Sequence, residues 1–396
     1  ENTTEAATVE EKKDPVTLTM LINKDWYSQS FQNCIKRYEE KTGNKMEVQV
    51  TPGEQPFQDA LTGKTVANEL PDVIAWYGTE GSIKTVKGDE IFLDITNEPF
   101  VKKIAPSILK QPEFLKVNGK LYGIPSGAVN VTGVIYNKKL FAENNIEIPK
   151  TWDEFLAVCE KLKAAGVAPI HEAAKDVWPI QLFQYAMVAN LVQKDKLELI
   201  EQIKAGTMDF TKNPEFRMVL EKLKEIVDKG YYNKDVASAT YDSQLADFAE
   251  NRAAMVIQAD WAIPTILEKY PDVGVNIGMF PLPTVENPII SYSDPWGLYL
   301  SRDSKNLEAA KGFFEFFTSD ENLNAYYSEL KGMPSYTGVT AGLNPGTADL
   351  APMMSDGRAV PFYTAVLLPG ITISIDSIGI ITKSKTIDTV LDEVQK

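Results

Sequence analysis

A regular alternation of short apolar runs and amphipathic segments over residues 16–77 constrains the fold more than any other feature of the sequence. Three apolar runs typical of buried strands occur at 16–22, 46–50 and 71–77. The segments between them have apolar residues at helical spacing, and the first of these segments ends at Gly43. This order predicts a parallel sheet with helices on its faces, and such sheets bind ligands at the carboxyl ends of their strands.

The length and charge of the chain narrow its class. A chain of 396 residues is longer than the chains that usually fold around one hydrophobic core, so we expect at least two lobes. The formal net charge of −15 argues against a nucleic-acid partner or an anionic membrane surface, which both require a basic footprint. Cys34 and Cys159 lie in amphipathic segments, which favours two buried thiols and leaves a disulfide between them open.

The sequence carries no recognisable catalytic motif. His171 is the single histidine, and no nucleophile elbow surrounds any serine. Dinucleotide-binding, P-loop and zinc-protease motifs are also missing from the sequence. We therefore expect a protein that is not an enzyme, with no catalytic residue, cofactor or metal. A secreted glycosidase remains an alternative, because the spacing of paired carboxylates in space cannot be read from sequence.

Five of the six tryptophans follow an expected strand or begin an expected helix, beside polar residues. These five are Trp26, Trp76, Trp178, Trp261 and Trp296. An indole ring can cover the apolar face of a sugar while neighbouring amides and carboxylates bind its hydroxyl groups. For each ring the alternative is packing in the core.

The sixth tryptophan, Trp152, has a different setting. It follows Thr151, which forms a capping-box pattern with Glu154, so we expect Trp152 to pack in the core at the start of a helix.

An ordered set of motifs resembles a known family. The segments are LPDVIAWY at 70–77, NGKLYGIP at 118–125, GVIYNKKLFAENNIEIPKTWDEF at 133–155, FAENRAAMVIQADWAI at 248–263 and AAKGFFEFFTSDEN at 309–322. Their order and spacing resemble the extracellular solute-binding subunits of ABC importers, in the carbohydrate-binding group that includes maltose-binding protein. The resemblance implies an α/β, two-lobed fold like that of periplasmic binding proteins, with a hinge of several crossings and a ligand cleft between the lobes.

The resemblance also implies how the chain is divided. We place hinge crossings near 126–130, 290–293 and 331–336. The expected parts are a disordered leader at 1–15, an N-terminal lobe of 16–127 and 292–332, and a C-terminal lobe of 128–291 and 333–396.

Ligand contacts carry over from the family one position at a time. Trp76 matches the aromatic residue of a ligand loop, Trp261 matches a stacking tryptophan, and Trp178 lies close to an aromatic contact of the C-terminal lobe. Asn130 stands where maltose-binding protein has an acidic residue, so we expect a different hydrogen-bond pattern to the sugar. The position of their loops adds further expected contacts at Trp26, Asp260, Asp294, Trp296 and Tyr363.

These expectations define one function with an alternative. We expect a monomer that binds a carbohydrate, more specifically an oligosaccharide, by lobe closure and delivers it to the permease of an ABC transporter. The expected location is the extracellular face of the bacterial membrane, or the periplasm in a Gram-negative cell. Membrane association is expected only through a lipid anchor upstream of the leader. The alternative is an importer subunit for a non-sugar solute such as a polyamine or a glycerophosphodiester.

Overall fold

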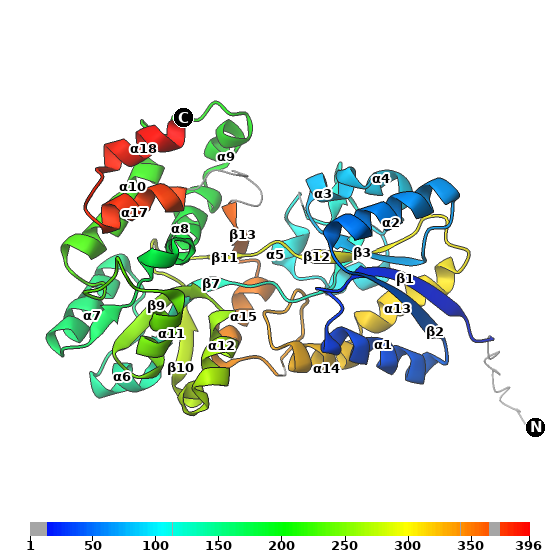
Figure 1. The fold of residues 1–396 in the computed structure, drawn as a ribbon, viewed down its shortest axis with the longest axis horizontal. Helices are drawn as coiled ribbons and strands as arrows, with labels where there is room; N and C mark the ends of the chain where they lie inside the picture. Colours follow the sequence, from blue (N-terminus) through cyan, green and yellow to red (C-terminus); the bar gives the residue numbers. More distant parts are fainter. Residues whose placement is uncertain (1–13, 113, 341, 364–372) are drawn as a thin grey trace, which may run out of the picture.

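The computed structural model describes residues 14–112, 114–340, 342–363 and 373–396. Most of the expected leader, residues 1–13, lies outside this range. The chain forms two α/β bodies joined by extended segments (Figure 1). Within the described residues, no helix has the length and apolar character needed to cross a membrane. The expected two-lobed α/β fold is confirmed.

The first body, here called the N-lobe, is built on a five-stranded sheet in the order β2-β1-β3-β12-β6. Its strands are β1 (Thr17–Asn23), β2 (Lys45–Thr51), β3 (Val73–Tyr77), β6 (Gly123–Pro125) and β12 (Trp296–Leu300). Its longer helices are α1 (Gln29–Thr42), α2 (Glu54–Ala67), α13 (Leu307–Phe317) and α14 (Asp320–Leu330). Shorter elements are α3 (Glu80–Thr85), α4 (Gly88–Ile91), α5 (Pro106–Leu109) and the hairpin of β4 (Lys116–Val117) and β5 (Lys120–Leu121).

The second body, here called the C-lobe, is built on a four-stranded sheet in the order β10-β7-β9-β8. Its strands are β7 (Thr132–Asn137), β8 (Ala168–Ile170), β9 (Ala253–Ala259) and β10 (Ile277–Phe280). Helices around it are α6 (Lys138–Glu143), α7 (Trp152–Ala164), α8 (Gln181–Val188), α9 (Leu197–Lys204), α10 (Pro214–Asp228), α11 (Tyr241–Ala249), α12 (Ala262–Lys269), α15 (Pro345–Ser355), α17 (Ile373–Ile381) and α18 (Ile387–Gln395). A small parallel sheet pairs β11 (Ile290–Tyr292) with β13 (Ala359–Pro361).

The predicted parallel arrangement is confirmed at the start of the chain, where β1 pairs in parallel with both β2 and β3. Residues 291–301 contribute to two sheets, because the chain leaves the C-lobe after β11 and enters the N-lobe at β12. At α7 the oxygen of Thr151 accepts from the Glu154 amide at 3.2 Å, as the capping box predicts. The Glu154 carboxylate, however, reaches the amide of Lys150 at 2.6 Å, one residue before the cap.

Three segments that connect the lobes lie side by side at the hinge. The central one is the extended segment 126–131, here called the hinge strand, which runs from β6 to β7. On one side its Val129 pairs with Met333, and on the other its Val131 pairs with Tyr292. The chain crosses again after β11 and after α14, so both flanking segments also run between the lobes (Figure 1).

The N-lobe end of this hinge strand is held by hydroxyl groups. Tyr336 donates to the carbonyl of Pro125, Tyr326 donates to that of Ser126 at 2.8 Å, and Tyr327 donates to that of Gly127 at 3.1 Å. All three tyrosine side chains are buried in the N-lobe. Side-chain hydroxyl groups thereby satisfy three successive carbonyls where the chain leaves β6, which fixes the entry of the chain into the hinge. We call this set the tyrosine clamp.

Glycine at position 332 allows two crossings to approach closely. A β-carbon built on Gly332 would lie 2.4 Å from the β-carbon of Ala128, so a larger residue must displace one of the two segments. Gly63, in the interior of α2, has nothing within 4 Å of the same position.

These two glycines make a matched pair for a stability measurement. Gly332→Ala should lower the free energy of unfolding by about 1–3 kcal/mol, because the added methyl group overpacks the hinge. Gly63→Ala should raise it by up to about 1 kcal/mol, because alanine has the better helix propensity. Urea unfolding followed by circular dichroism measures both. Equal effects of the two substitutions would contradict the close approach at the hinge.

Candidate functional site

Three aromatic rings gather at one end of the N-lobe sheet. Trp26 lies just after β1, Tyr77 ends β3, and Trp296 begins β12 and pairs with Tyr77. The indole rings of Trp26 and Trp296 stack with centroids 5.2 Å apart, and Tyr77 meets Trp26 edge-on at 4.8 Å. All three side chains are partly exposed. We call Trp26, Tyr77 and Trp296 the N-lobe aromatic group.

Carboxylates surround this aromatic group. The Tyr77 hydroxyl donates to Glu54 at 3.3 Å. Burial raises the pKa of Tyr77, and the negative charges of Glu54, Asp294 and Asp25 raise it further. Burial also raises the pKa of the Asp294 carboxyl. The N-lobe part of the site therefore combines apolar ring faces with acceptor oxygens and a negative potential.

A second set of rings lies at the corresponding end of the C-lobe sheet. Trp261 comes two residues after β9, and Trp178 follows β8, which is parallel to β9. The ring of Trp178 lies 4.8 Å from that of Tyr241 and 6.2 Å from that of Trp261, measured between centroids. These side chains are also partly exposed. We call Trp178, Tyr241 and Trp261 the C-lobe aromatic group.

The backbone before Trp178 is strained. Val177 has a φ of 66°, in a region that β-branched residues rarely adopt. Such a conformation costs on the order of 1–3 kcal/mol and persists only where surrounding contacts enforce it. One of those contacts is the Asp176 carboxylate, which accepts from the backbone amide of Tyr241 at 2.6 Å and so ties the loop to the start of α11.

The two aromatic groups flank the hinge strand. At one end the Ser126 amide donates to the carbonyl of Trp296, and at the other end the Asp260 amide donates to the carbonyl of Val131, both at 3.0 Å. Five residues of extended chain span at most ~18 Å, so the two groups are anchored within that reach of each other along the strand. In the described residues no ring of one group contacts a ring of the other.

Asn130 lies on the hinge strand between the two groups. Its backbone amide donates to the Ser293 hydroxyl at 3.0 Å, and its carbonyl accepts from the Ser293 amide at 2.8 Å. Both bonds use backbone atoms of Asn130, and its side chain is half-exposed.

Three of the residues expected to contact a ligand have buried side chains. Trp76 is 2% exposed, its ring stacks on Phe57 at 5.0 Å, and its indole N–H donates to the Ser82 carbonyl at 2.7 Å. Tyr363 is fully buried and packs edge-on against Tyr185. Neither ring offers a free face in this structure.

Asp260 is the third buried residue, with 3% of its surface exposed. Its carboxylate accepts from the Val131 amide at 3.0 Å and from the Thr347 hydroxyl at 3.1 Å. Both oxygens therefore already have protein partners, which argues against a direct contact with a ligand.

Two rings of these aromatic groups, Tyr77 and Tyr241, were not among the residues expected from the sequence. Tyr77 directly follows Trp76, and successive side chains of a strand point to opposite faces, so only one of the two could pack beneath α2. Because Tyr77 is also the last residue of β3, its ring lies at the sheet edge. Tyr241 begins α11 directly after the capping Thr240, a position that gives no sign of its contact with Trp178.

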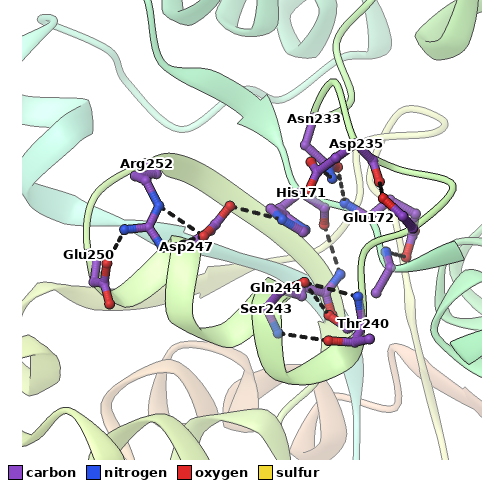
Figure 2. Close-up of polar contacts among 12 residues, drawn as sticks. His171, Glu172, Asn233, Asp235, Thr240, Ser243, Gln244, Asp247, Glu250 and Arg252 are labelled. Atoms are coloured by element: carbon purple, nitrogen blue, oxygen red, sulfur yellow. Dashed lines mark hydrogen bonds and ion pairs between the residues drawn. The ribbon is translucent and has the colours of Figure 1, made fainter. Parts of the chain in front are cut away.

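The single histidine belongs to a buried polar network at the end of β8 (Figure 2). The Nε2 atom of His171 lies 3.1 Å from a carboxylate oxygen of Asp247, which also pairs with Arg252. Burial lowers the pKa of His171, and the charge of Asp247 opposes this shift. The His171 carbonyl accepts from Gln244 at 2.8 Å. Among the described residues no hydroxyl or thiol hydrogen-bonds to His171, so no catalytic triad is assembled there.

Neither thiols nor metal ligands supply chemistry in the described part of the chain. Cys34 and Cys159 are buried and unpaired, and burial raises the pKa of Cys34 to about 12. In the described residues, no group of three or more histidine, cysteine or acidic side chains is placed to hold a metal ion.

The sequence profile of the family described as bacterial extracellular solute-binding protein matches residues 24–323. A multiple sugar-binding protein of Streptococcus mutans is 25% identical over 327 residues, which cover 82% of this chain and 76% of that protein. Among solved structures, the apo form of RafE from Streptococcus pneumoniae has a TM-score of 0.77 at 20% identity and covers 98% of both chains. RafE in complex with raffinose has a TM-score of 0.69 at 20% identity and covers 96% of this chain and 97% of that one.

The fold has two α/β lobes, and in the described residues no catalytic triad is assembled around His171. The match over most of the sequence identifies the family: the chain belongs to the bacterial extracellular solute-binding proteins.

The buried carboxyl of Glu172 yields a stability prediction for the loop that leads to Trp178. Glu172 is 1% exposed and accepts from the Ala173 amide at 2.8 Å. Burial raises its pKa from 4.5 to about 7. A raised pKa in the folded state means that stability is present below the unfolded value and is lost as the pH rises through the folded value.

Glu172→Gln removes this titration while keeping an oxygen that can accept from Ala173. The variant should therefore gain stability relative to the unmodified protein as the pH rises from about 4.5 to about 7, by up to about 3 kcal/mol. Chemical denaturation at several pH values measures the difference. Glu315→Gln, on the exposed side of α13, is the control and should not reproduce the gain. A gain for Glu172→Gln that is independent of pH would contradict the assignment.

Proposed function

We propose that this protein binds a carbohydrate, and more specifically an oligosaccharide, between the two aromatic groups and delivers it to the permease of an ABC importer. The observation that carries the proposal is the pair of partly exposed aromatic groups, one on each lobe, anchored to opposite ends of the hinge strand. Indole and phenol rings suit the C–H faces of sugars, and the carboxylate and amide oxygens beside them suit the hydroxyl groups.

Binding is proposed to close the lobes. In the present structure the two groups make no ring contact with each other, so a sugar held by both needs the groups to approach one another. The higher TM-score to apo RafE than to its raffinose complex supports a ligand-free arrangement here. A ligand that contacts both groups binds the closed form more tightly than the open form and so shifts the population toward it.

The names of similar proteins support a sugar over other solutes. The relative from Streptococcus mutans is called a multiple sugar-binding protein, and RafE is described in complex with raffinose. The proposed contact set is Trp26, Tyr77, Asn130, Trp178, Tyr241, Trp261, Asp294 and Trp296. Trp76, Asp260 and Tyr363 are left out of this set because their side chains are buried.

A cationic solute such as a polyamine is the second candidate. The observation that favours it is the cluster of Asp25, Glu54 and Asp294 beside aromatic rings, since ring faces and carboxylates both attract cations. Spermidine therefore belongs in the same calorimetric screen as the sugars. Tight binding of spermidine with no binding of any oligosaccharide would replace the carbohydrate proposal.

Trp261→Ala tests the C-lobe part of the site. Loss of this ring should weaken binding of an oligosaccharide such as raffinose at least tenfold, about 1.4 kcal/mol or more. Isothermal titration calorimetry measures the affinity. Trp152→Phe is the matched control, because Trp152 is a C-lobe tryptophan packed in the core, with its N–H bonded to Glu225. Undiminished affinity in a folded Trp261→Ala protein would remove the C-lobe group from the site.

The carboxylates predict selectivity by charge. An acidic oligosaccharide such as trigalacturonate should bind at least about tenfold more weakly than a neutral trisaccharide, because its charge meets the negative potential near Tyr77. Salt should narrow the difference, since it screens exposed charges. Calorimetry at low and at high salt measures this. Tighter binding of the acidic sugar at low salt would contradict the negative potential assigned to the site.

A further inference from the structure

The hinge strand is held at one end by the N-lobe and at the other end by the C-lobe. On the N-lobe side the tyrosine clamp binds the carbonyls of residues 125–127. On the C-lobe side both backbone groups of Val131 are bonded to Asp260. Between these anchors the strand is bonded to the other two crossings, through Val129 to Met333 and through Asn130 to Ser293.

Asp260 makes its anchor with side chain and backbone together. Its carboxylate accepts from the Val131 amide at 3.0 Å, while its own amide donates to the Val131 carbonyl at 3.0 Å. The second carboxylate oxygen accepts from the Thr347 hydroxyl of α15 at 3.1 Å. One buried residue thereby joins the hinge strand, the end of β9 and the helix that follows the third crossing.

The same residue sets the position of Trp261. The Asp260 carbonyl accepts from the Ile263 amide at 3.1 Å, which begins α12 directly beneath Trp261. The start of α15 is packed closely on this turn, since a β-carbon on Gly346 would lie 2.7 Å from the side chain of Ile263. Trp261 thus lies on the turn between β9 and α12, here called the Asp260 corner. This turn is packed against α15 and bonded to the hinge strand, so it cannot move independently of them.

We infer that Asp260 is a positioning residue for ligand binding, whose carboxylate locks Trp261 to the hinge strand and to α15. Trp261 then moves as one body with Val131 and the start of α15. We call the hydrogen bonds of the Asp260 carboxylate to Val131 and Thr347 the lock. Its effect on affinity rests on the proposed function, but the lock itself is present in the protein without ligand.

Asp260 is the titratable group of this corner. The hinge strand, β9 and β10 carry no ionisable side chain, and the hydroxyl of Tyr292 in β11 is engaged with the Ser107 carbonyl. The first ionisable residue of α12 is Glu268, at its far end. On α15 the first is Asp349, which accepts from the Met279 amide at 3.0 Å and lies 3.9 Å from Lys138.

The lock should therefore depend on pH. Burial raises the pKa of Asp260 to about 7, against the opposing effect of its hydrogen bonds. An opened corner hydrates the carboxyl and returns its pKa toward the ordinary value of about 3.9. The closed lock then binds a proton more tightly than the open one, so opening becomes more favourable as the pH rises between these two values.

Hydrogen exchange of the Val131 amide in the full chain without ligand tests this directly. After correction for the intrinsic exchange rate, protection should fall at least about tenfold between about pH 5 and about pH 7. Asp260→Asn keeps an oxygen acceptor but cannot titrate, so its protection should change less than about threefold over the same range. Asp349→Asn is the matched control and should behave as the unmodified protein.

Affinity for raffinose gives the functional arm of the test. Asp260→Ala should weaken raffinose binding at least about tenfold, whereas Asp260→Asn should stay within about threefold of the unmodified protein. The inference would be overturned if protection of the Val131 amide did not change with pH in the unmodified protein. It would also be overturned if that protection changed with pH in Asp260→Asn as it does in the unmodified protein. Failure of the unmodified protein to bind any neutral oligosaccharide would instead count against the proposed function, and the exchange result would still decide the lock.

Discussion

Backbone hydrogen bonding of a single extended segment, Ser126–Val131, governs how this molecule is organised. A strand that leaves one sheet and enters another loses its regular neighbours, and buried carbonyls without partners are costly. Here the N-lobe supplies tyrosine hydroxyls to three successive carbonyls, and the C-lobe supplies the backbone and carboxylate of Asp260. Each end of the strand thus belongs to the core of one lobe, and the residues between are bonded to the other two crossings through Met333 and Ser293.

This arrangement explains why the candidate site lies where it does. The carboxyl ends of the parallel strands in both sheets face the hinge, so the loops after β1, β3, β8 and β9 carry their aromatic residues to that region. Features that cost stability gather on the C-lobe side of it. Val177 is strained, and Glu172 and Asp260 are buried carboxyls with raised pKa values. Proteins tolerate such costs mainly where geometry must be kept for function.

The sequence predicted the general architecture well because the pattern of buried strands and helices is local. It also indicated Trp26, Trp178, Trp261 and Trp296 as loop residues, and the structure places all four at sheet ends with partly exposed rings. It could not separate Trp76 from Tyr77, because which face of a central strand lies beneath a helix is decided by tertiary packing.

Long-range contacts explain the other differences between the structure and what the sequence predicted. The role of Asp260 depends on Val131 and Thr347, which lie far from it in the sequence, so its burial could not be read from the loop alone. Thr347, which completes the contacts of Asp260, lies on α15, in the part of the chain that follows the third crossing. The convergence of the two aromatic groups on one sugar stays a prediction.

The distance between the lobes, measured with and without sugar, tests that convergence most directly. Spin labels at Val66→Cys on the N-lobe and Ile148→Cys on the C-lobe use side chains that are 84% and 45% exposed, while the native Cys34 and Cys159 are buried. Pulsed electron paramagnetic resonance should show a shorter label-to-label distance once an oligosaccharide that binds in calorimetry is added at saturation. An unchanged distance distribution with the sugar bound would contradict the account, because the two aromatic groups would then not close on a common ligand.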